Sequence, residues 1–180
     1  MFEIQFGPME WLNGPEDDPR DLCSHGEVSV CLGDKRLTYA CCTSAAAIRM
    51  LRSLTEDHEM EDHWRGEQML PCCGHAMYPS DDGQSVYVSG CPNGIDYAVG
   101  HAADAVVITT EDGSVYDVPF GDYFRETMRF IDAVEAFYKK STPKILPEDA
   151  FSRDGYLAFW KEWDRRKDNL KKFYFPENNA

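Results

Sequence analysis

Basic side chains are scarce in this sequence. The 180 residues include 18 Lys or Arg against 32 Asp or Glu, so the formal net charge is −14. The imbalance lies in residues 1–150, with 27 acidic and 11 basic side chains, whereas residues 151–180 carry 5 and 7. A negative field repels nucleic-acid phosphates and anionic lipids and attracts cations. We therefore expect no nucleic-acid or membrane partner, and we expect a basic protein as the partner.

Long apolar runs are also missing. Runs such as residues 45–48 are far shorter than a bilayer span. The N-terminus has neither the basic region nor the apolar core of a secretory signal. We expect a soluble, cytoplasmic protein in which the seven cysteines stay reduced and several serve as small buried hydrophobes.

Complete catalytic signatures are the third absence. The chain has no G-x-S-x-G elbow, no P-loop and no G-x-G-x-x-G phosphate loop. Catalytic residues can converge only in the fold, so this absence lowers the expectation of an enzyme without removing it. The sequence favours binding over chemistry.

The pattern of apolar residues predicts one α+β domain over residues 1–180, with an antiparallel β-meander sheet and amphipathic helices packed mainly on one face. Its parts are three N-terminal strands with an acidic loop (1–42), a helix capped by Thr43 or Ser44 (43–55), a five-stranded meander (73–120) and two C-terminal helices (122–172). Asp122 is the expected N-cap of the first C-terminal helix, which we expect to cover the meander.

Thiol and imidazole side chains gather at Cys72, Cys73, His75 and Cys91. These are ligands that zinc prefers, but structural zinc sites space paired cysteines as C-x₂-C. Adjacent residues on a strand point to opposite faces, so Cys72 and Cys73 can bind one ion only from a kinked segment. The simpler interpretation is buried thiols beside a hydrogen-bonded histidine; a zinc site, or a hydrolase built on it, is the alternative.

The segment from His58 to His63 resembles a metalloprotease helix only at first sight. Its two histidines are five residues apart, roughly 140° around a helix, where the protease motif needs four. Asp62 would face His58 as a weak metal pair. A solvated acidic face is the favoured interpretation.

Acidic loops are the candidate partner-binding surface, since carboxylates in loops accept hydrogen bonds from Arg and Lys of a basic protein. Solubility alone is the equal alternative. The candidates are Glu16, Asp17, Asp18, Glu56, Asp57, Glu59, Glu61, Asp62, Asp81 and Asp82.

The last helix carries aromatic and basic groups. Tyr156, Phe159, Trp160 and Trp163 recur at helical spacing, which predicts core packing rather than a docking surface. The basic cluster of residues 165–172 is expected to pair with the protein's own carboxylates.

The segments Val118-Pro119-Phe120, Phe130 to Tyr138 and Gly155 to Trp163 resemble small bacterial proteins, some of which are regarded as immunity proteins of polymorphic toxin systems. The resemblance covers the C-terminal half through diffuse motifs. It implies an acidic, non-catalytic inhibitor of a basic toxin and assigns no binding residue. The alternatives are the zinc-binding protein and a structural or oligomeric module, and no cofactor other than zinc is expected.

Overall fold

The N-terminal third forms a three-stranded antiparallel sheet that leads directly into a buried helix. In the computed structural model, which describes residues 1–60, 66–74 and 76–174, strand β1 (Phe2–Phe6) pairs with β2 (His25–Leu32), and β2 pairs with β3 (Lys35–Cys42). Helix α1 (Thr43–Arg52) follows at once, with Cys42 as its N-cap. Thr43 and Ser44 therefore lie inside the helix, and the expected cap at either residue is wrong.

The middle of the chain is not one continuous meander. Strands β5 (Ala76–Pro79) and β6 (Val86–Ser89) form a separate hairpin, and β8 (Tyr97–Ala102), β9 (Ala105–Thr110) and β10 (Val115–Pro119) form a three-stranded sheet. The short strand β7 (Gly94–Ile95) pairs with β4 (Leu70–Pro71) instead of joining either sheet.

Asp96 explains this division. Its buried carboxylate accepts the backbone N–H groups of Met69 and Tyr97 at 3.0 and 2.9 Å and contacts the ring of His58. These bonds tie the segment after β6 to the segment before β4. The chain therefore leaves the hairpin before it enters the next sheet.

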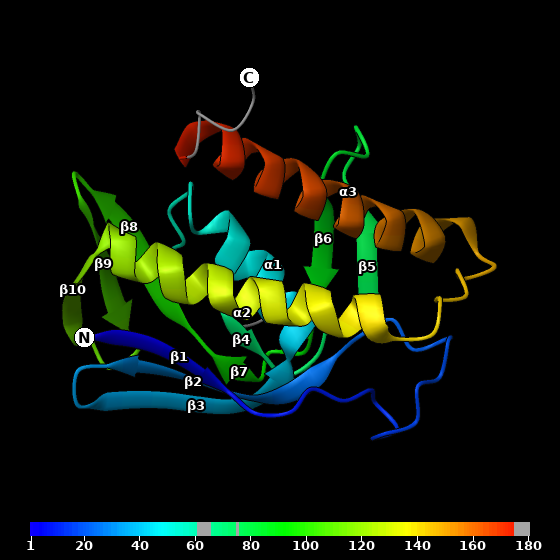
Figure 1. The fold of residues 1–180 in the computed structure, drawn as a ribbon, viewed down its shortest axis with the longest axis horizontal. Coiled ribbons are helices and arrows are strands. Elements are labelled where there is room, and N and C mark those ends of the chain that lie inside the picture. The colour runs from blue at the N-terminus through cyan, green and yellow to red at the C-terminus, as the bar shows by residue number, and fades with distance from the viewer. Residues whose placement is uncertain (61–65, 75, 175–180) are drawn as a thin grey trace.

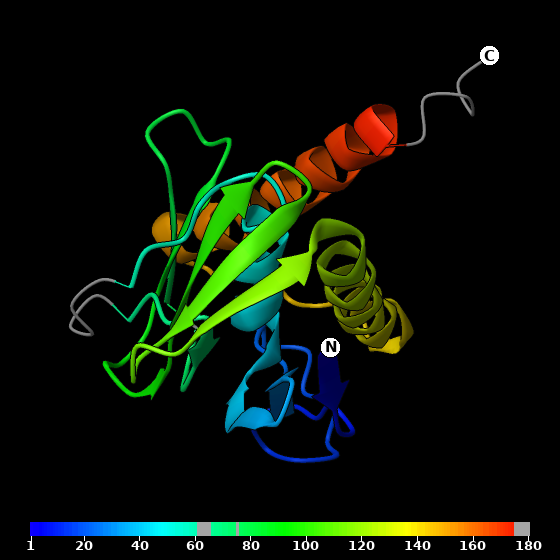
Figure 2. The ribbon, with the colours of Figure 1, turned by 90° about the vertical axis from the view of Figure 1, so that its left-hand side faces the viewer.

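Two long helices lie side by side across α1. Helix α2 (Phe120–Lys140) and helix α3 (Ala150–Tyr174) run along the same side of the molecule, with the β8–β10 sheet at one end (Figures 1 and 2). Helix α2 begins at Phe120 after Pro119, so Asp122 lies in its first turn rather than at the cap.

The core is shared by all these elements. Helix α2 packs chiefly against α1 and β1, with smaller contacts to β9 and β10, so it does not serve mainly as the cover of the meander. Phe2 and Phe6 of β1 contact Tyr123 and Phe130 of α2 at ring-centroid distances of 5.1 and 5.3 Å. The α+β class is confirmed, with small antiparallel sheets and helices in one packed structure.

Helix α3 uses its aromatic stripe as the sequence predicts. Phe159 and Trp163 are fully buried and Tyr156 nearly so, whereas Trp160 is half-buried. Among the described residues, none of the helices combines the length and apolar character required to cross a membrane.

Candidate metal centre

Three cysteine thiols converge at one surface. The Sγ atoms of Cys72, Cys73 and Cys91 all lie within 4.8 Å of one another, and all three residues are half-buried. Zinc–sulfur bonds of about 2.3 Å in tetrahedral geometry place the sulfurs about 3.8 Å apart. A small closure of the cluster would therefore satisfy thiolate coordination of one metal ion.

A bend after β4 removes the objection raised by the adjacent cysteines. Strand β4 ends at Pro71, and Cys72 occupies a bend outside the strand. The Cys72 N–H donates to the carbonyl of Asn93 at 3.0 Å, which holds this bend against the turn after β6. The alternation of side chains along a strand does not apply here, so both sulfurs can face one point.

Two glycines allow the turns to approach closely. A Cβ atom at Gly90 would lie 2.6 Å from the carbonyl oxygen of Cys73, and one at Gly94 would lie 2.6 Å from that of Leu70. Gly94 also has a φ of +153°, where side chains are strained. Any larger residue at either position would push the two cysteine-bearing turns apart.

Arg49 joins the two segments that lead into the cysteine-bearing turns. Its buried guanidinium donates to the carbonyls of Gly66 at 2.6 Å, Val88 at 3.0 Å and Gln68. These residues precede β4 and lie in β6, so one side chain of α1 binds both segments. Burial lowers the pKa of Arg49 to about 10, which leaves it charged at neutral pH.

The three thiols differ in acidity. The Asn93 N–H stabilises the thiolate of Cys91 and lowers its pKa. A hydrogen bond to Cys91 raises the pKa of Cys72, and burial raises that of Cys73. The Cys91 N–H also donates to the sulfur of Cys73 at 3.1 Å. The cluster therefore contains one thiol whose ionisation the surroundings favour and two whose ionisation they disfavour, and a metal must displace the protons of the latter two.

The other four cysteines are of a different kind. Cys23, Cys31, Cys41 and Cys42 are buried, as expected of small hydrophobic residues. Hydrogen bonding to the Cys23 thiol lowers the pKa of Cys42 to about 6. The interpretation of the cysteines as buried thiols therefore fits these four residues. It does not fit the three cysteines of the cluster, which are only half-buried.

Three of the other residues considered as metal ligands, His75, Asp62 and His63, lie outside the described residues, as does the partner-binding candidate Glu61. His58 is described, and its Nε2 lies 2.9 Å from the carboxylate of Asp96.

The candidate partner-binding carboxylates that the structure describes lie in three separate places. Residues 16–18 lie beside the loop after α2, Glu56, Asp57 and Glu59 follow α1, and Asp81 and Asp82 occupy the β5–β6 turn (Figure 1). Several have internal partners instead: Asp17 binds Lys144, Glu56 binds Arg166, Asp57 binds His101, and Asp82 accepts bonds from Ser80 and Gln84. The basic residues of α3 likewise pair with Glu56, Asp132, Glu135, Glu162 and Asp168, as predicted.

Arg49, Gly90 and Gly94 were not singled out from the sequence. The one available signal was an arginine within the apolar stripe of the first helix, between Ile48 and Leu51. Such a residue must satisfy its guanidinium inside the protein. Its carbonyl partners are remote in the sequence and only the fold identifies them.

Comparison with known proteins gives no relative: no family model, no curated protein and no solved structure matches the chain.

Proposed function

We propose that this protein binds a zinc ion through the thiolates of Cys72, Cys73 and Cys91. The observation that carries the proposal is the convergence of three partly exposed sulfurs within 4.8 Å, from two turns that other contacts already hold together. Thiolates are soft ligands that favour zinc over magnesium and calcium, which prefer oxygen.

The residues around the cluster fit this role. The N–H groups of Asn93 and Cys91 donate to the sulfurs of Cys91 and Cys73, and such outer bonds orient metal ligands and disperse their charge. All three cysteines are partly exposed, so a metal ion can reach the cluster from solvent. Zinc held by the three thiolates would link the two turns and would supply a Lewis acid.

Metal analysis tests the proposal directly. We expect about one zinc per chain after purification without chelator, and the same content in a Cys31→Ser variant, which changes a cysteine outside the cluster. Cys91→Ser should lose the metal. Wild-type protein that retains only a trace of zinc after reduction and incubation with excess zinc would refute the proposal, as would equal zinc contents in the two variants.

A second function, binding of a cationic protein, is favoured by three unpaired carboxylates. Glu16, Glu59 and Asp81 are exposed and have no ion-pair partner within the described part of the chain. The resemblance to immunity-type inhibitors would make that partner a basic toxin, and this remains a prediction.

The test is association with a lysine-rich peptide at low and high salt. The on-rate should fall with salt and in a Glu59→Lys, Asp81→Lys variant, because steering is electrostatic. Reversal of the remote Asp117 is the control. A salt-independent on-rate would exclude this function.

A further inference from the structure

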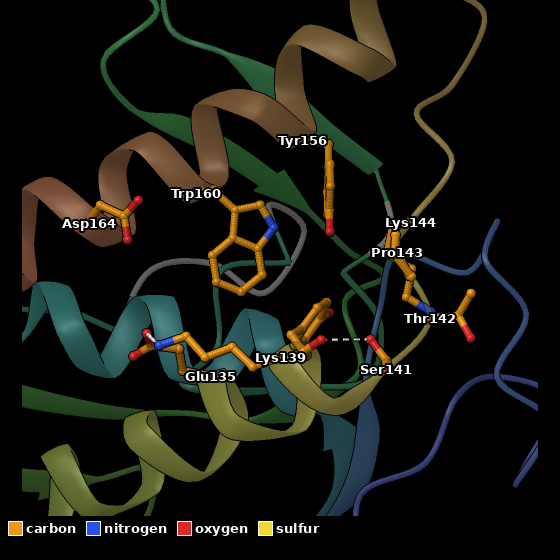
Figure 3. Close-up of a pocket in the computed structure, with 10 residues that line it drawn as sticks. Glu135, Lys139, Ser141, Thr142, Pro143, Lys144, Tyr156, Trp160 and Asp164 are labelled. Atoms are coloured by element: carbon orange, nitrogen blue, oxygen red, sulfur yellow. Dashed lines mark hydrogen bonds and ion pairs between the residues drawn. The ribbon is translucent and has the colours of Figure 1, made fainter.

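The aromatic stripe of α3 has two sides with different surroundings. Phe159 and Trp163 are buried in the core, whereas Tyr156, Trp160 and Asp164 recur at every fourth residue along the helix and line a pocket of about 350 Å³. The opposite wall comes from Tyr138, Lys139 and Ser141 at the end of α2 (Figure 3). A volume of this size is within the range of small-molecule sites.

The aromatic rings of the pocket meet near right angles. The ring of Trp160 lies 5.0 Å from that of Tyr138 at 73°, and 6.4 Å from that of Tyr156 at 86°. Perpendicular rings form the corner of a box, and the faces of aromatic rings carry negative potential. Boxes of this kind bind alkylammonium groups by cation–π attraction.

The two lysines of the pocket are already neutralised. Lys139 extends along α2 and pairs with Glu135, as Figure 3 shows. Lys144 binds Asp17 at 2.8 Å and lies over the ring of Trp11. Neither ammonium group is left to repel a bound cation at full strength.

One carboxylate of the pocket remains available. Asp164 is exposed and has no ion-pair or hydrogen-bond partner among the residues that the structure describes. The C-terminal end of α2, where the Ser141 N–H and hydroxyl both donate to the carbonyl of Tyr138, adds the negative end of a helix dipole. Ring faces, a free carboxylate and a helix C-terminus all favour positive charge.

We propose that the pocket between the end of α2 and the Tyr156–Asp164 face of α3 binds a quaternary ammonium group. The site is independent of the thiol cluster. The group could belong to a small free compound or to a trimethylated lysine side chain, and the two have the same chemistry at the pocket.

Calorimetric titration with choline and with 3,3-dimethylbutan-1-ol, its uncharged isostere, tests the assignment. Choline should bind about tenfold more tightly, because the two ligands match in shape and differ in charge. A trimethyllysine peptide and its unmodified counterpart form the second arm. Selective binding of choline identifies a free compound, and selective binding of the methylated peptide identifies a side chain; each supports the site.

Variants locate the binding. Asp164→Asn should weaken it about threefold and Trp160→Leu about tenfold, while Asp117→Asn on the distant strand β10 removes the same charge without effect. Asp164 is exposed, so its variant keeps the fold even if Trp160→Leu does not.

Equal binding of choline and its isostere, no binding in either arm, or equal weakening by Asp164→Asn and Asp117→Asn would overturn the proposal. Removing zinc with a chelator should leave the titration unchanged, which separates this site from the metal centre.

Discussion

Glu162 of α3 accepts two hydrogen bonds from the Arg52 side chain of α1, at 2.8 Å from Nε and 2.7 Å from Nη2. The same carboxylate accepts the Val86 N–H at 2.9 Å and the Arg166 Nε at 2.8 Å. Its side chain is fully buried, so four donors from three elements replace water. This group joins α1, α3 and the β5–β6 hairpin at one point.

Glu162→Gln should destabilise the protein by about 3 kcal/mol, because it leaves Arg52 and Arg166 in a buried site without the negative charge. Urea denaturation measures the change. Asp168→Asn is the matched control: its carboxylate pairs with Lys171 on the exposed side of the same helix, and its loss should cost less than about 1 kcal/mol. Similar losses in the two variants would contradict the structural role of Glu162.

The same carboxyl group predicts a dependence of stability on pH. Despite its burial, hydrogen bonds and charge from Arg52 lower the pKa of Glu162 to about 2 from a usual value of 4.5. A lowered folded-state pKa means that the stabilisation is complete above about pH 4.5 and is lost as the pH falls toward about 2. The difference in unfolding free energy between wild type and Glu162→Gln should therefore shrink across that interval. A difference that stays constant would show that Glu162 is not the titrating group.

The structure leaves no room for a side chain at Gly155, not even the methyl group of alanine. A Cβ atom there would lie 2.0 Å from the carbonyl oxygen of Met77 in β5, where α3 crosses the strand. Gly→Ala inside a helix normally stabilises by up to about 1 kcal/mol, but here overpacking should reverse the sign and cost about 2 kcal/mol or more.

Gly121→Ala in α2 is the control for Gly155, since nothing lies within 4 Å of the added atom. Thermal unfolding of the pair should show a fall in melting temperature for Gly155→Ala and no fall for Gly121→Ala. A melting temperature of Gly155→Ala at or above that of wild type would show that α3 and β5 can separate without cost.

The local pattern of apolar residues predicts most helices and strands, but it does not predict which strands of the middle region pair. Apolar periodicity locates α2 and α3, because each of these helices buries one face. Helix α1 is instead buried on all sides from Thr43 to Leu51, and its apolar and small residues locate it without a regular exposed face. The break between β6 and β8 follows from Asp96, whose partners Met69 and His58 are 27 and 38 residues away along the chain. A buried carboxylate with remote donors leaves no periodic signal, so the sequence suggests one meander where the chain forms a hairpin and a separate sheet.

At the candidate metal site, too, the sequence identifies some residues and only the fold identifies the others. Residue type alone marks Cys72, Cys73 and Cys91 as candidate zinc ligands, because zinc ligands are few and chemically distinct, whereas their spacing favours buried thiols. The groups that position them, Arg49 and the close glycine contacts, act through backbone carbonyls that every residue possesses. For the acidic loops, the sequence shows charge but not that Lys144, His101 and Arg166 already pair with several carboxylates.

Zinc binding should release protons in a number set by the acidity of the three thiols. The pKa values of Cys72 and Cys73 are raised and that of Cys91 is lowered, so at neutral pH at least the first two must lose a proton to coordinate the metal. With two or three protons released, the apparent affinity should rise about a hundredfold to a thousandfold per pH unit near neutrality. Calorimetry in two buffers of different ionisation enthalpy counts the protons, and Cys31→Ser should give the wild-type count. Metal binding without proton release would mean that the ion is held elsewhere, by groups that are already ionised, such as the surface carboxylates.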